Sequence, residues 1–166
     1  MALAACSPSP SASSVAVPDI PFRADAKLSY NGIDLTAEIT RSAAGKWELS
    51  VTDPYPLEGV SIVLCGDETR LSMLGLEASA DVADGAVSAA KAIAAAYDAA
   101  VSSPAPFTAT DSGYTLSGSC ELGAFTVVLG ADGNPAAFSC DPVGLSVTLS
   151  AFSPLPPSEI EAEIIE

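Results

Sequence analysis

The chain has 166 residues, of which 49% are hydrophobic, and its 21 acidic and six basic residues give a formal net charge of −15. Because phosphate backbones are bound by clustered lysine and arginine, this composition argues against nucleic-acid binding. The sequence contains no histidine, which excludes Ser-His-Asp and Cys-His catalysis and histidine metal ligands. It also has no serine-nucleophile motif and no Cys-x-x-Cys pair, so we expect neither an enzyme nor a metal or cofactor protein.

The N-terminal residues have the features of a lipid-modified export sequence. Leu3-Ala4-Ala5-Cys6 resembles the lipobox of bacterial lipoproteins, in which the cysteine thiol is acylated. The Ser/Pro-rich stretch that follows buries too little apolar surface to fold, which predicts a tether over residues 7–18. The resemblance implies that residues 1–6 are the remainder of a signal sequence and that acylated Cys6 binds the lipid bilayer. The alternative is an unmodified cysteine in an unfolded end.

Residues 19–153 are predicted to form one domain that starts with antiparallel strands. Apolar and polar residues alternate strictly on both sides of Asn31-Gly32, a dipeptide typical of a tight hairpin turn. Such alternation is expected of a sheet with one wet face and one apolar face. In this first half of the domain we predict strands at 22–30, 33–40, 46–51, 60–65 and 69–74.

A long helix is predicted over residues 80–102. Apolar residues recur there every three or four positions, from Val82 through Ile93 to Val101, which places them on one helix face. Pro104 prevents the helix from continuing. Alanine dominates the segment, so the helix can lie close against a sheet or leave room beside it.

Four more strands are predicted after the helix, at 114–119, 125–129, 135–140 and 145–150. The Asp132-Gly133 turn signal suggests that Cys120 and Cys140 lie on neighbouring strands. Outside the cytoplasm a disulfide between these two cysteines is an alternative to two free thiols, and the sequence leaves both open. We expect Cys65 to be a buried small hydrophobic residue. Residues 154–166 are predicted to be a flexible acidic tail.

These elements predict an α+β fold of about nine antiparallel strands with one long Ala-rich helix. Their order and the lipobox resemble the LolA/LolB/LppX-like bacterial lipoproteins, and residues 47–59 resemble a strand-and-turn segment of Gram-positive members of unknown role. The resemblance implies a curved, unclosed sheet, or half-barrel, with the helix packed on its concave face. In that superfamily the concave face carries acyl chains or other lipids.

We therefore expect an extracytoplasmic lipoprotein, anchored to the outer face of the bacterial cell membrane, that binds a lipid or other hydrophobic ligand in the concavity of its sheet. The alternative is a tethered structural or protein-interaction module with a filled core and no ligand. For each cavity residue, the competing interpretation is an ordinary packed core position. The residues expected to line the cavity are Trp47, Leu49, Val51, Ile62, Leu64, Leu71, Met73, Ile93 and Tyr97.

Overall fold

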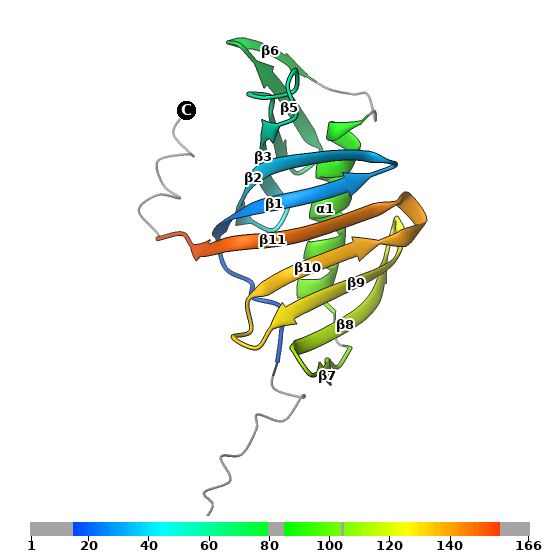
Figure 1. The fold of residues 1–166 in the computed structure, drawn as a ribbon. Coiled ribbons are helices and arrows are strands. Elements are labelled where there is room, and N and C mark those ends of the chain that lie inside the picture. Colours follow the sequence, from blue (N-terminus) through cyan, green and yellow to red (C-terminus); the bar gives the residue numbers. More distant parts are fainter. Residues whose placement is uncertain (1–14, 80–84, 104, 157–166) are drawn as a thin grey trace, which may run out of the picture.

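The computed structural model describes residues 15–79, 85–103 and 105–156. Within these ranges the chain forms one open antiparallel sheet of 11 strands and a single α-helix, so the prediction of an α+β fold is confirmed (Figure 1). The prediction of about nine strands is too low. The elements are β1 (Phe22–Tyr30), β2 (Ile33–Ala43), β3 (Lys46–Asp53), β4 (Ser61–Cys65), β5 (Glu68–Met73), β6 (Leu76–Ser79), α1 (Ala86–Val101), β7 (Thr108–Thr110), β8 (Gly113–Cys120), β9 (Gly123–Gly130), β10 (Pro135–Cys140), the 3₁₀ turn η2 (Asp141–Val143) and β11 (Leu145–Pro154).

The sheet consists of two meanders that meet in the middle. Its strand order is β6-β5-β4-β3-β2-β1-β11-β10-β9-β8-β7, and the two halves join where β1 pairs with β11. The helix lies between β6 and β7 in the chain, and these two strands form opposite edges of the sheet. The chain therefore crosses the whole sheet between them, and α1 makes this crossing against one face (Figure 1).

The two strands that the sequence did not predict are the edge strands β6 and β7. They have four and three residues, all exposed, so neither shows the alternation that identifies a strand. Their positions become visible only through pairing with β5 and β8. The predicted helix also differs at its start, because the described helix begins after Gly85 and residues 80–84 lie outside the described ranges.

The apolar faces of the central strands bury a continuous core beneath the helix. In β1 the alternation is exact over seven residues, with Phe22, Ala24, Ala26 and Leu28 buried and the intervening residues exposed. The predicted hairpin turn is confirmed: Asn31 and Gly32 have φ of 50° and 80°, a conformation that glycine adopts freely and asparagine tolerates. The core also includes Val17, which precedes the predicted domain start.

Small side chains let α1 approach the sheet closely. Ala89 and Ala96 are completely buried, and Ile93 and Tyr97 supply the large side chains on the same covered side. The helix packs chiefly on β3, β4 and β8 to β11. Its main contacts therefore lie on both sides of the central pair β1–β2, and they do not include the β5–β6 margin.

Candidate functional site

Most of the predicted cavity residues are packed core in this structure. Seven of the nine are at most 6% exposed, and they belong to the same hydrophobic cluster. The remaining two, Leu71 and Met73, are only partly buried at the margin of this cluster. The structure thus brings all nine together, but the seven with little exposed surface fill the space in which a ligand was expected. They are Trp47, Leu49, Val51, Ile62, Leu64, Ile93 and Tyr97.

A buried arginine, which the sequence did not single out, holds the helix in the concavity. The Arg41 side chain is 1% exposed. Its Nε donates to Asp98 Oδ1 of α1 over 3.0 Å, and its Nη2 donates to Asp19 Oδ1 over 2.9 Å. Its Nη1 donates to the carbonyl oxygen of Ile20 over 3.3 Å. A buried guanidinium is tolerated only when it is paired and hydrogen-bonded, and these contacts meet that need.

Asp98 accepts hydrogen bonds with both of its carboxylate oxygens. Beside the Arg41 contact, Oδ2 accepts from the backbone N–H of Gly45 over 2.9 Å and from Trp47 Nε1 over 3.0 Å. One carboxylate thereby connects α1 to β2, to the β2–β3 turn and to β3. Arg41, Asp98, Gly45 and Trp47 thus form a structural latch between the helix and the sheet.

Tyr97 lies beside this latch and extends it to the N-terminal segment. Its hydroxyl donates to the carbonyl oxygen of Pro18 over 3.1 Å. Burial raises the pKa of Tyr97 well above its usual range; the positive charge of Arg41 opposes this rise, and the charges of Asp98 and Asp19 add to it. The tyrosine is therefore a neutral hydrogen-bond donor at physiological pH.

Toward the β6 edge, the helix α1 no longer covers the inner face of the sheet. Residues opposite one another in an antiparallel pair share a face, so Leu49, Ile62, Leu71 and Ala78 form one inward-facing row across β3 to β6. Leu49 is 3% exposed and Ile62 is completely buried, whereas Leu71 is half-buried and Ala78 is exposed. The apolar inner face thus continues past the region that α1 covers.

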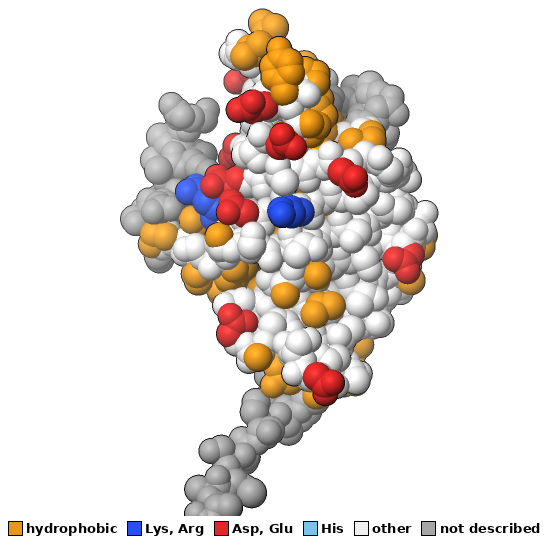
Figure 2. All heavy atoms as spheres, viewed as in Figure 1, with side chains coloured by type: hydrophobic (Ala, Val, Ile, Leu, Met, Phe, Trp, Pro, Cys, Tyr) orange, Lys and Arg blue, Asp and Glu red, His pale blue; other side chains and the backbone are white. Residues whose placement is uncertain are grey.

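Exposed hydrophobic side chains gather at this same end of the molecule. Leu76 pairs with Met73 and is 78% exposed, and Leu74 in the β5–β6 turn is 87% exposed. Tyr55, in the neighbouring β3–β4 connection, is 86% exposed. Figure 2 shows hydrophobic side chains concentrated at the β5–β6 end, at the top of the view. We call Leu71, Met73, Leu74, Leu76 and Ala78 the β5–β6 apolar surface.

The turn at the end of this surface has an unfavourable leucine conformation. Leu74 has φ of 52° and Gly75 has φ of 79°, so the leucine occupies the left-handed region in which glycine or asparagine is usual. A bulky, almost fully exposed side chain at such a position contributes little to the core. Non-glycine residues in this region often occur at functional sites, which directs attention to this turn.

A cleft of about 360 Å³ lies beside the exposed side of α1. Lys91, Ala94 and Asp98 line it from the helix, Asp67 from the β4–β5 turn and Glu121 from the β8–β9 turn. Asp98 is already occupied by the latch described above. The cleft therefore offers an acidic rim with one lysine, which disfavours an anionic headgroup.

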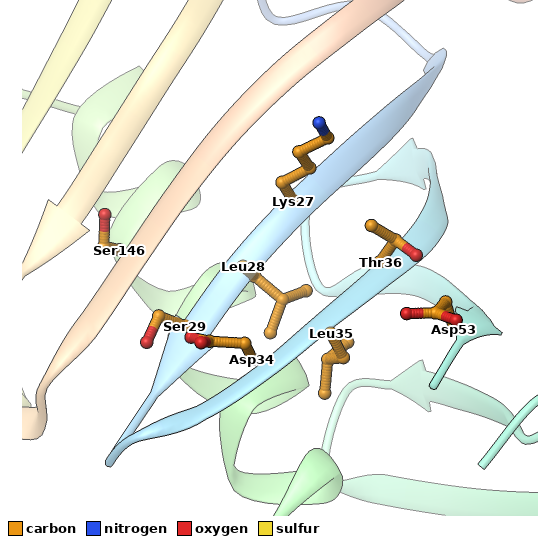
Figure 3. A pocket seen from close by; sticks show the side chains of 8 residues that line it. All are labelled: Lys27, Leu28, Ser29, Asp34, Leu35, Thr36, Asp53 and Ser146. Carbon is orange, nitrogen blue, oxygen red and sulfur yellow. The ribbon is translucent and has the colours of Figure 1, made fainter. Parts of the chain in front are cut away.

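A second hollow, of about 310 Å³, lies over β1 and β2 (Figure 3). Ser29 and Asp34 face each other across the two strands, and Lys27 lies opposite Thr36. Asp53 of β3 closes one side. Leu28 and Leu35 also line this hollow, so its surface is mixed and mainly apolar. It contains no histidine or cysteine, and we assign no chemistry to it.

The part of the chain that the structure describes shows neither a metal-binding group nor a membrane-spanning helix. It contains no group of three or more His, Cys, Asp or Glu residues arranged to hold a metal ion. Among the same residues, no helix combines the length and the hydropathy needed to cross a membrane. The predicted lipidation site Cys6, most of the tether and residues 157–166 of the predicted tail lie outside the described ranges.

The three described cysteines differ in their surroundings. Cys65 is exposed, so the prediction that it is a buried hydrophobic residue is wrong. Cys140 is buried and Cys120 is partly buried, and all three carry free thiols. Cys120 and Cys140 end β8 and β10, and β9 lies between these strands, so they are not on neighbouring strands as predicted.

Comparisons with known proteins show similarity to solved structures. No family model and no curated protein matches the sequence. A crystal structure of an uncharacterized conserved protein from Thermus thermophilus shares 16% identity, with 86% of this chain and 85% of that chain covered and a TM-score of 0.48. A LolA superfamily protein from Nitrosomonas europaea shares 9% identity, with 90% and 93% covered and a TM-score of 0.45. At these values the comparisons do not establish a family.

Proposed function

We propose that this protein is an extracytoplasmic lipoprotein, anchored through acylated Cys6, that binds a lipid or other hydrophobic ligand on the β5–β6 apolar surface. The observation that carries the ligand proposal is the inward-facing row of Leu49, Ile62, Leu71 and Ala78, which extends beyond the part of the sheet that α1 covers. Leu71 and Met73 were predicted to line a cavity, and Leu76 and Ala78 extend their surface to the sheet edge. This position replaces the middle of the concavity as the expected ligand site.

The chemistry of the surface favours an apolar ligand. The five side chains of this surface are aliphatic or thioether groups, and the buried Thr69 precedes them on the inner face of β5. The outer face of the same strands carries Arg70, Ser72 and Glu77. Covering one exposed leucine contributes about 2 kcal/mol, so covering Leu74 and Leu76 supplies about 4 kcal/mol before the cost of association is subtracted. An acyl chain laid along the two strands would cover both and would continue the hydrophobic core outward.

Titration with a fluorescent fatty acid tests this proposal. Leu76→Glu places a charge in the centre of the surface without touching the buried core, and we expect it to weaken probe binding at least tenfold. Ile33→Glu is the matched control, because Ile33 is 45% exposed on the β1–β2 hairpin. We expect this control to bind as the wild type does. Equal binding by all three proteins would contradict the proposed site.

The membrane anchor needs a separate experiment. An alkyne analogue of palmitate, supplied to a bacterial host that expresses the chain with a complete lipoprotein signal sequence, should label the wild type. Cys6→Ser should abolish the label and release the protein from the membrane fraction. Labelling that persists in this variant would contradict acylation at Cys6.

A tethered interaction module without a ligand is the second candidate. The observation that favours it is the filled core, in which seven predicted cavity residues are at most 6% exposed. In this case the wild type would bind no fatty acid. A protein partner would instead crosslink to the β5–β6 apolar surface, and the Leu76→Glu variant would lose that crosslink.

A further inference from the structure

The ends of β8 and β10 bring two cysteines to the same corner of the sheet. Cys120 is the last residue of β8 and pairs with Gly123 across the β8–β9 turn. Cys140 is the last residue of β10, and its neighbour Ser139 pairs with Thr126 of β9. Two strand spacings normally separate alternate strands by about 10 Å, so this pairing alone would hold the two thiols apart.

The segment after Cys140 reduces this separation by folding over Gly123. A Cβ atom placed on Gly123 would lie 2.6 Å from Cγ of Pro142, so the first turn of η2 rests directly on the glycine. Gly123 is the cross-strand partner of Cys120, and Pro142 is only two residues beyond Cys140. The missing side chain at position 123 therefore lets the two cysteine-bearing segments converge across the start of β9.

The Cys120 thiol affects the protonation of the Cys140 thiol. Burial raises the pKa of the Cys140 thiol, and the charge and hydrogen bond of the Cys120 thiol raise it further. Cys120 is partly exposed, whereas Cys140 has no exposed surface. The pair thus combines one partly accessible thiol with one enclosed thiol.

We propose that Cys120 and Cys140 form an intramolecular disulfide when the folded protein meets a disulfide oxidant. The Cys120 thiolate attacks one sulfur of the oxidant, which forms a mixed disulfide and releases the first thiol. The Cys140 thiolate then attacks Sγ of Cys120 and displaces the second thiol. Two protein thiols lose two protons and two electrons, and the oxidant is reduced to two thiols. The bond ties β8 to β10 and fixes Glu121 at the rim of the cleft beside α1.

Oxidised glutathione acting on the reduced, folded full chain tests the proposal. The Cys6→Ser background leaves three cysteines, and residual thiols are blocked with N-ethylmaleimide after an acid quench. We expect one maleimide per chain, on Cys65. Cleavage after glutamate then separates residues 78–121 from 122–159, and these two peptides should remain joined until a reductant is added.

The pH dependence and two variants complete the test. The mixed disulfide should form first and should close faster as the pH rises, because Cys140 must lose its proton before it attacks. Cys65→Ser should leave the crosslinked peptides unchanged, and Cys120→Ser should remove them. Three maleimides on the folded protein after exhaustive oxidation, or a bond to Cys65, would overturn the proposal. Formation of the bond only in denaturant would overturn it as well.

Discussion

Replacement of Asp98 by alanine should destabilise the protein more than any other carboxylate substitution in the same cleft. The change removes the acceptor of three N–H groups, from Arg41, Gly45 and Trp47, at 3.0, 2.9 and 3.0 Å. It leaves the Arg41 guanidinium, 1% exposed, with Asp19 as its remaining carboxylate partner. Breaking a buried ion pair by removing one partner costs about 3–5 kcal/mol.

The lower end of that range is the better expectation here. The Asp98 side chain is 22% exposed and lines the cleft beside α1, so water can replace part of the lost hydrogen bonding. We therefore expect a loss of about 3 kcal/mol in the free energy of unfolding, or roughly 6–12 °C in Tm for a domain of this size.

Urea unfolding followed by the fluorescence of Trp47, the chain's single tryptophan, measures this loss. Asp67→Ala is the matched control, because Asp67 lines the same cleft but is exposed; we expect its effect to stay within about 0.5 kcal/mol. Adding Arg41→Met to Asp98→Ala should recover part of the loss, since the unpaired charge is removed. A loss below about 1 kcal/mol for Asp98→Ala would refute the argument for a buried latch.

Three further predictions concern titration, backbone conformation and covalent stabilisation. The folded-state pKa of Tyr97 lies above its unfolded value near 10, so the contribution of Tyr97 to stability should be constant below that pH and fall above it. Urea midpoints from pH 8 to 11 should therefore fall less steeply for Tyr97→Phe. Gly113→Ala should cost about 2 kcal/mol or more in urea unfolding, because its Cβ would collide with the carbonyl oxygen of Leu129, whereas Gly75→Ala, with open space around it, should cost about 1 kcal/mol. The Cys120–Cys140 disulfide closes a loop of roughly twenty residues and should raise the free energy of unfolding by about 3 kcal/mol in the oxidised over the reduced protein.

Strands with one buried and one solvent-exposed face could be predicted from the sequence, because the polarity of each residue matches the side of the sheet on which it lies. The run from Phe22 to Tyr30 shows this, since its alternation matches its burial position by position until its last two residues. The edge strands β6 and β7 have no buried face, so their residues contain no comparable signal. Their existence depends on pairing with partners that the local sequence does not identify.

Arg41 was missed for a different reason. Its partners Asp19 and Asp98 lie 22 and 57 positions away, and no local pattern connects them. The one available hint was the alternation from Leu35 through Ala37 and Ile39, which places position 41 on the apolar face of its strand. A charged residue at such a position indicates a buried ion pair, because an isolated charge there would be too costly.

The proposed ligand surface could be predicted only in part. Leu71 and Met73 were predicted to line the same cavity as Leu49 and Ile62, and the four residues lie on the inner face of neighbouring strands. The difference between a filled core and an open surface depends on where α1 crosses the sheet. Tertiary packing determines where α1 crosses the sheet, and the periodicity of the sequence alone does not predict that packing.

Photocrosslinking with a diazirine-labelled fatty acid tests the proposed ligand surface most directly. Cleavage after Arg70 and Lys91 releases residues 71–91, which contain the end of β5 and all of β6. We predict that the label is attached to this peptide between Leu71 and Ala78, and that excess unlabelled fatty acid prevents its attachment. Label confined to β8–β11, or label that excess fatty acid does not reduce, would contradict ligand binding on the β5–β6 apolar surface.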